Sequence, residues 1–147
     1  MANCSVPVHV ASELVTAFQE FQRGKSDVKF MSFRLCGKDL STLELADSGA
    51  DAATHDEFVE RTMVGGEPRF NFLKFAYDLG DDGKRVKTVL VMWVPPKCGV
   101  RAKMLSAAAR SVVKKALGFG YGLELFAGDK AEASEEAVLA KCLSMTR

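Results

Sequence analysis

One stretch constrains the fold of this chain more than any other: residues 89–94, VLVMWV, are apolar without interruption. A half-buried strand alternates apolar and polar residues, whereas a strand that is apolar at every position is covered on both faces. Pro95 and Pro96 end the run, because proline supplies no backbone N–H to a neighbouring strand. We therefore expect a central strand within a sheet that has helices packed over it.

The patterns on either side of this strand predict a mixed α/β fold. Ser12 and Thr54 are candidate caps for two helices, and Glu57 completes a capping-box pattern with Thr54. Asp82 and Gly83 indicate a hairpin turn, and Ser134 starts a C-terminal helix. We expect helices over 12–24, 54–63, 98–118 and from 134 onward, strands over 27–35, 40–46, 69–79, 86–94 and 121–128, and a loop over 47–54.

Length and composition favour a single globular domain over 1–147, with residues 1–11 as a flexible N-terminal arm. The net charge of +1 provides no overall field for nucleic acid or membrane, so any electrostatic function needs a local patch. No apolar run is long enough to cross a bilayer, and the N-terminus lacks the pattern of a signal peptide. We expect a cytoplasmic monomer with four free thiols: Cys4, Cys36, Cys98 and Cys142.

The helix expected over 98–118 has two different sides. A helical wheel places six residues on the side expected to pack on the sheet: Leu105, Ala108, Ala109, Val112, Val113 and Ala116. Lys103, Arg110 and Lys114 form a basic stripe elsewhere, and no acidic residue lies one helical turn away to neutralise it. The plain alternative is an amphipathic helix with a solvated basic edge. We predict instead a surface that binds an acidic partner.

The segment VMWVPPKCGVRAKMLSAAARSVVKKAL resembles the signature of the ADF/cofilin family. The resemblance extends in order along nearly the whole chain, through ELVTAFQEF, GKSDVKFMSFRL, DGKRVKTVLVMW and SEEAVLAKC. It implies the ADF-homology fold, a mixed sheet of about five or six strands sandwiched by helices. It also implies a protein that binds actin monomers and filaments, prefers ADP-actin and promotes depolymerisation and severing, with no cofactor.

The resemblance implies two actin-binding surfaces. The positions that match the monomer surface are Ser5, Val6, Arg101, Lys103, Met104, Arg110 and Lys114. Those that match the filament surface are Lys84, Arg85, Lys87, Asp129 and Lys141. Ser5 also matches a serine at which many family members are phosphorylated, and phosphoinositide headgroups are expected to compete with actin for the basic residues.

Several positions depart from the family pattern. Ser106 replaces a tyrosine, which predicts altered packing, while Ala108, Ala109 and Ser111 replace two serines and an aspartate. Ala140 and Ser144 stand where some relatives carry charges for filament contact. These departures leave a second interpretation open: a coactosin-like or glia-maturation-factor-like protein that binds filaments or the branch-nucleating complex without efficient severing.

Other classes of function have weaker support. His9 and His55 have no visible nucleophile partner and are expected to be surface residues, so an enzyme is not predicted. The run GFGYG at 118–122 follows a helix and precedes a strand, the wrong order for a dinucleotide-binding loop, and fits a helix C-cap. The acids of DLGDDGKRV do not have calcium-loop spacing. A nucleic-acid-binding module would need more positive charge and exposed aromatic residues.

Overall fold

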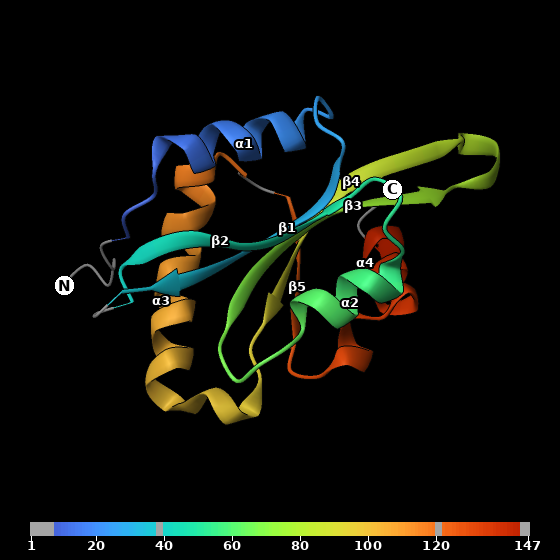
Figure 1. The fold of residues 1–147 in the computed structure, drawn as a ribbon. Coiled ribbons are helices and arrows are strands. Elements are labelled where there is room, and N and C mark those ends of the chain that lie inside the picture. The colour runs from blue at the N-terminus through green and yellow to red at the C-terminus, as the bar shows by residue number, and fades with distance from the viewer. Residues whose placement is uncertain (1–7, 38–39, 120–121, 145–147) are drawn as a thin grey trace, which may run out of the picture.

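The computed structural model describes residues 8–37, 40–119 and 122–144. Its centre is a five-stranded mixed sheet in the order β2-β1-β3-β4-β5 (Figure 1). Only the pair β4–β5 is parallel among the described strands. The strands are β1 (Val28–Cys36), β2 (Thr42–Ala50), β3 (Arg69–Asp78), β4 (Lys84–Trp93) and β5 (Leu123–Ala127). The predicted mixed sheet is confirmed.

Helices cover both faces of this sheet, four of them within the described residues (Figure 1). Helices α1 (Ser12–Gln22) and α3 (Gly99–Leu117) pack on one face, and α2 (His55–Thr62) and α4 (Glu135–Ser144) on the other. In the described parts of the chain, three short 3₁₀ turns join the elements: η1 (Gly80–Asp82), η2 (Pro96–Cys98) and η3 (Lys130–Ala133). The long helix α3 connects the parallel strands β4 and β5, as a crossover between parallel strands requires.

Strand β4 is covered on both faces, as its sequence predicts. Every residue from Val89 to Trp93 is buried. Leu90 and Met92 belong to the core under α1 and α3, while Val89, Val91 and Trp93 belong to the core under α2 and α4. The uninterrupted apolar run is therefore explained by two separate cores that share one strand.

The core beneath α1 is built largely from phenylalanine rings. Phe18 and Phe21 of α1 are fully buried, as the apolar spacing of that helix predicts. The ring of Phe18 meets that of Phe72 edge-on, with centroids 4.6 Å apart, and Phe72 meets Phe119 at 5.1 Å. Edge-to-face contacts of this kind stabilise a core beyond the area they bury.

Strand β2 runs four residues beyond its predicted end. Residues 47–50 were expected to be loop, but they pair with β1, with Asp47 opposite Ser32 and Gly49 opposite Phe30. Gly49 is needed there because a Cβ atom at this position would overlap the ring of Phe30. Arg61 binds the side chain of Asp47 at 2.6 Å. Pairing with β1 and this ion pair therefore override the polar, turn-like sequence.

Of the two predicted helix caps, Thr54 is confirmed and Ser12 is not, and Ser134, predicted as the start of the C-terminal helix, also forms a cap. Thr54 Oγ1 accepts a hydrogen bond from Glu57 N–H at 3.1 Å, and Ser134 Oγ accepts one from Ala137 N–H at 3.2 Å. The prediction for Ser12 is wrong, because Ala11 occupies the N-cap and Ser12 Oγ donates to its neighbour Glu13.

The described part of the N-terminal arm is attached to the sheet. His9 N–H donates to Ser41 O at 2.6 Å, and Leu43 N–H donates to His9 O at 2.9 Å. Val8 and Val10 pack against the core under α1 and α3. The expected arm is thus anchored from Val8 onward.

Candidate functional site

The start of α3 is held in a fixed place by the end of β4. Val94 N–H donates to Ala127 O at 2.9 Å, which ties the strand exit to β5. Pro95 is buried, and Cys98 N–H donates to its carbonyl at 3.1 Å. Gly99 then begins the helix with φ of 86°, a region that glycine adopts without strain.

The buried stripe of α3 differs from the predicted one. Ala109 and Val113 are buried as expected, and the other buried members are Ser106 and Leu117. The remaining predicted members, Leu105, Ala108, Val112 and Ala116, are only half-buried. The wheel gives angles between residues but not the direction of the sheet. Because α3 also contacts α1, its buried side is turned toward Ser106 and Leu117.

The opposite side of α3 is an exposed and partly apolar ridge. Val100 is 74% exposed and Met104 67% exposed, and Ala107 and Ser111 continue the same line at helical spacing. We call these four residues the α3 ridge. Large apolar side chains this exposed are typical of a protein-binding surface. Met104 was predicted from the sequence, whereas Val100 was missed, although its spacing of four from Met104 could have revealed it.

Two exposed cations lie beside the ridge. Arg101 and Lys103 are both exposed, and within the described ranges neither forms an ion pair. The first turn of α3 contains no acidic residue. Cations at a helix N-terminus are disfavoured by the helix dipole, which is positive at that end. The positive potential of the helix dipole adds to that of the two side chains, so this end of the molecule attracts carboxylates and phosphates.

The second half of the basic stripe is neutralised, contrary to expectation. Arg110 and Lys114 both form ion pairs with Glu124 of β5. The side chain of Glu124 is only 18% exposed and that of Lys114 only 19%. The acid is absent from α3 itself and comes from the strand that follows it, which is why helical spacing could not reveal it.

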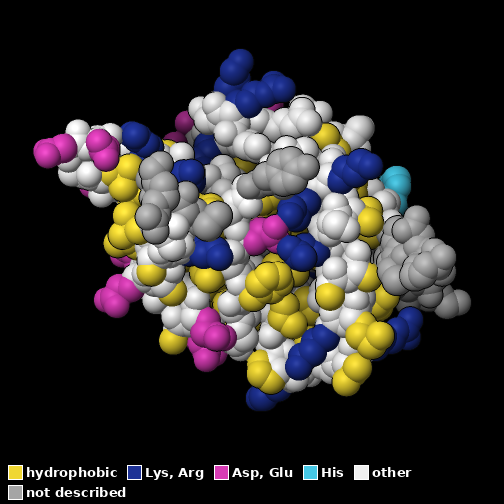
Figure 2. All heavy atoms as spheres, turned by 180° about the vertical axis from the view of Figure 1, so that it is seen from behind, with side chains coloured by type: hydrophobic (Ala, Val, Ile, Leu, Met, Phe, Trp, Pro, Cys, Tyr) yellow, Lys and Arg dark blue, Asp and Glu magenta, His cyan; other side chains and the backbone are white. Residues whose placement is uncertain are grey.

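Phe126 extends the exposed apolar surface from α3 onto β5. Its side chain is 55% exposed, and the guanidinium carbon of Arg110 lies 5.3 Å from its ring centroid. Arg110 is therefore held by a carboxylate and a ring together, and its side chain remains 35% exposed. Figure 2 views the molecule from the back, where basic and apolar side chains are interspersed. No sequence pattern singled out Phe126.

Glu124 should contribute stability that depends on pH. Burial raises the pKa of Glu124, but hydrogen bonds from Lys114 and Arg110 outweigh it, so the net pKa lies below the ordinary value. Its stabilising effect is therefore full above the ordinary glutamate pKa of about 4.3 and is lost as the pH falls through the lowered value.

We expect Glu124→Gln to lower the free energy of unfolding by about 1 kcal/mol at neutral pH, because Arg110 and Lys114 lose their partner. Urea unfolding of both proteins from neutral to acid pH measures this, and the difference should vanish once the wild-type carboxylate is protonated. Glu60→Gln is the control, since Glu60 is 67% exposed in its pair with Lys130. A Glu124 effect that persists in acid would contradict the assigned pKa shift.

The hairpin residues of the predicted filament surface divide between two sides of β4. Arg85 and Lys87 point to one side and Lys84 to the other, because successive strand residues alternate. Lys87 faces α4, where Cys142 is buried. Burial raises the pKa of the Cys142 thiol, and the nearby positive charge of Lys87 partly offsets this increase. Arg85 Nη1 donates to Asp82 O at 2.9 Å, beside the exposed acids of η1. The hairpin tip is therefore mixed in charge.

The other predicted filament residues lie near α4. Asp129 is exposed, and its carboxylate accepts a hydrogen bond from Glu132 N–H at 3.0 Å, so it caps η3. Lys141 is half-buried on α4. Figure 1 shows the hairpin tip projecting far from the start of α3, so the hairpin part of the predicted filament surface is separate from the start of α3. Ser5 and Val6 lie outside the described residues.

The remaining chemistry-bearing residues have structural settings. His9 is exposed as expected, but His55 is half-buried, with Nε2 2.8 Å from Ala133 O and its ring near Phe58 and Phe75. Its prediction as a surface residue is wrong because α2 packs it against β3 and η3. Among the described residues, no cluster of histidine, cysteine or carboxylate side chains could hold a metal ion. None of the described helices combines the length and apolarity required to cross a membrane.

The family model for cofilin/tropomyosin-type actin-binding proteins matches residues 7–143. The cofilin of Ogataea parapolymorpha is 35% identical over 135 residues, which is 91% of this chain and 91% of that protein. The cofilin of Saccharomyces cerevisiae is 31% identical over 133 residues, 90% of each chain. This chain therefore belongs to the cofilin/ADF family of actin-binding proteins, which are not enzymes.

Solved structures agree with the fold. A cofilin from Streptomyces griseoflavus superposes with a TM-score of 0.76 at 26% identity, over 91% of this chain and 96% of that one. Human coactosin-like protein gives the same TM-score at 18% identity, over 95% of this chain and 92% of that one. The second likeness shows the fold alone. The ADF-homology fold expected from the sequence is confirmed.

Proposed function

We propose that this protein binds actin monomers and filaments, prefers ADP-actin, and promotes filament depolymerisation and severing in the cytoplasm. One observation carries the proposal: the start of α3 presents Val100 and Met104 beside two cations, Arg101 and Lys103, that form no ion pair with any other described residue. This combination suits a partner with an apolar cleft bordered by carboxylates. Arg101 would bind a carboxylate bidentately, and the flexible thioether of Met104 would fill the cleft.

Filament weakening requires no covalent chemistry. A protein that binds one twist of the filament better than another shifts the filament toward that twist by its difference in affinity. Contacts between subunits would then loosen at boundaries between decorated and bare segments. The separation of the α3 start from the β3–β4 hairpin supports this account, because one molecule could then contact two neighbouring subunits (Figure 1).

Co-sedimentation with actin filaments tests the binding itself. We expect the protein to pellet with filaments in a saturable manner, and to slow nucleotide exchange on ADP-actin monomers. If it remained in the supernatant and left exchange unchanged, the proposed function would be wrong.

The filament surface predicts a selective defect. We expect Lys84→Ala with Arg85→Ala to weaken filament binding roughly tenfold and to leave monomer binding nearly unchanged, because both side chains are exposed on the hairpin and far from α3. Co-sedimentation and monomer exchange measure the two affinities on the same preparation. Equal losses in both assays would contradict the two-surface assignment.

A second candidate function rests on α4. Ala140 and Ser144 are both exposed and uncharged there, so this part of the filament surface provides no ion pairs from these two positions. A coactosin-like protein that binds filaments without efficient severing, or a glia-maturation-factor-like protein that acts on the branch-nucleating complex, would fit this feature. Filaments that are decorated but keep their length would favour the first, and binding to the branch-nucleating complex the second.

The same cations would bind phosphoinositide headgroups. Arg101 and Lys103 lie at the positive end of α3, which favours phosphate as well as carboxylate. Such headgroups should therefore compete with actin. Flotation with phosphoinositide vesicles, in the presence and absence of monomeric actin, would reveal this competition.

A further inference from the structure

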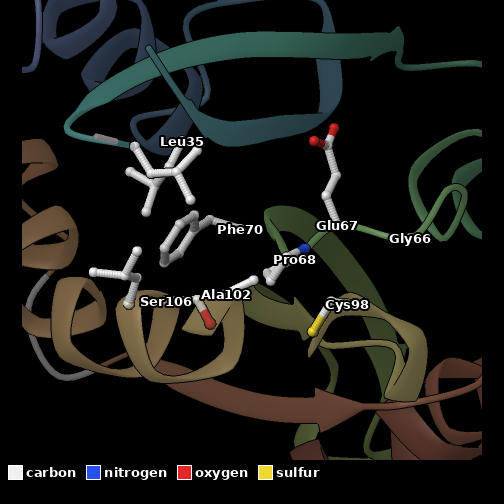
Figure 3. A pocket seen from close by; sticks show the side chains of 10 residues that line it. Leu35, Gly66, Glu67, Pro68, Phe70, Cys98, Ala102 and Ser106 are labelled. Atoms are coloured by element: carbon white, nitrogen blue, oxygen red, sulfur yellow. The ribbon is translucent and has the colours of Figure 1, made fainter. Parts of the chain in front are cut away.

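A pocket of about 150 Å³ lies behind the start of α3, on the side away from the α3 ridge. Figure 3 shows side chains from α3, from the end of β1 and from the segment before β3 directed into the same space. Ala102 and Ser106 form its α3 wall, Leu35 and Phe70 its sheet wall, and Pro68 closes one side. Phe70 is fully buried, so the pocket reaches the core.

The polar side chains around this pocket already have partners. Ser106 Oγ donates to Lys103 O at 3.0 Å, and Glu67 Oε1 accepts from Arg34 Nη1 at 3.0 Å. The Cys98 thiol is a weak donor whose sulfur lies 3.6 Å from Gly99 O. A buried water needs two to four polar partners, and a charged ligand needs a counter-ion. Glu67 is the one charged residue of this lining and its carboxylate is already paired with Arg34, so the mainly apolar lining favours an apolar occupant.

The volume of the pocket limits the size of the molecule that it can hold. A void of about 150 Å³ lined by aliphatic and aromatic side chains is large enough to hold a molecule of the size of benzene. Gly66 lines the pocket and is exposed, so the rim reaches the surface and leaves a path for entry.

Ser106 is the residue that keeps the space open. It is only 2% exposed and lies on the buried stripe of α3, where a large apolar side chain would be the ordinary choice. Its small side chain leaves room that a ring at the same position would occupy. The pocket thus lies at the position where the sequence predicts altered packing.

We propose that this pocket is a binding site for a small, uncharged, apolar molecule of aromatic or compact aliphatic character. This site is distinct from the actin-binding surface, and the proposal does not depend on actin binding. An occupant would touch Ala102 and Ser106, in the same helical turns that carry Arg101 and Lys103.

The test uses the whole protein with fluorobenzene as the probe. Fluorine NMR should show a broadened or shifted probe signal with the wild-type protein, and saturating probe should raise the melting temperature by about 3 °C. No change in either signal would overturn the proposal. Because no actin is present, this result is independent of the proposed function.

A pair of matched variants locates the site. Ser106→Phe should fill the pocket and weaken probe binding at least ~tenfold, whereas Ser111→Phe, the same change at an exposed position of α3, should bind the probe like the wild type. If Ser106→Phe fails to fold, Ala102→Val narrows the same wall with less strain and should also weaken binding. Equal probe binding by the wild type and by the folded pocket variant would overturn the assignment to this pocket.

Discussion

Replacement of Arg101 and Lys103 by alanine is expected to weaken binding to ADP-actin monomers by roughly a hundredfold or more, with the melting temperature nearly unchanged. Each charge-assisted hydrogen bond to a partner carboxylate contributes about 1.5 to 3 kcal/mol, and every 1.4 kcal/mol changes the affinity tenfold. Both side chains are exposed and form no ion pair with another described residue. Their removal should therefore cost the fold nothing, and relief of the unfavourable helix dipole should stabilise α3 slightly.

Nucleotide exchange on ADP-actin monomers measures the first effect and a thermal melt the second. Arg23→Ala with Lys25→Ala is the matched control. It likewise removes one arginine and one lysine, but from exposed positions after α1, at the other end of the molecule (Figure 1). This control should bind monomers like the wild type. A large fall in melting temperature for the Arg101 and Lys103 variant would instead assign these residues a structural role.

Replacement of Phe72 by alanine is expected to lower the free energy of unfolding by about 3 to 5 kcal/mol, a large fraction of the stability of an ordinary domain. Phe72 is fully buried in β3. Its ring contacts those of Phe18, Phe33 and Phe119, so its loss would open a cavity where α1 meets the sheet.

Urea unfolding followed by circular dichroism measures this change. Phe126→Ala is the control with the same chemistry, because Phe126 is 55% exposed on β5, and it should cost less than about 1 kcal/mol. Similar losses from the two variants would mean that the ring cluster beneath α1 is not the main support of that face.

The parts of the fold that the sequence predicts well are those decided by local patterns. The apolar run in β4 and the spacing of Phe18 and Phe21 each need a buried environment that few arrangements provide. The end of β2 could not be predicted in this way, because Asp47 and Gly49 have turn-like character. Their strand conformation depends on β1 and on Arg61, which lie elsewhere in the sequence.

The same distinction applies to the candidate site. The family resemblance singled out Arg101, Lys103 and Met104 from the sequence, and all three are exposed. The pairing of Arg110 and Lys114 with Glu124 follows only once α3 is known to cross between the parallel strands β4 and β5. The pocket beside Ser106 likewise needs three segments in place, although the unusual serine marked the position.

The central claim is that the start of α3 binds actin and that this binding weakens filaments. Fluorescence imaging of single ADP-actin filaments, with the wild-type protein and with the Arg101 and Lys103 double variant side by side, tests it most directly. We predict that the wild type decorates filaments, severs them and speeds their shortening, and that the variant does so only at much higher concentration. The account would be contradicted if filaments stayed bare and kept their length in the presence of the wild-type protein. Equal shortening of filaments by both proteins would contradict it as well.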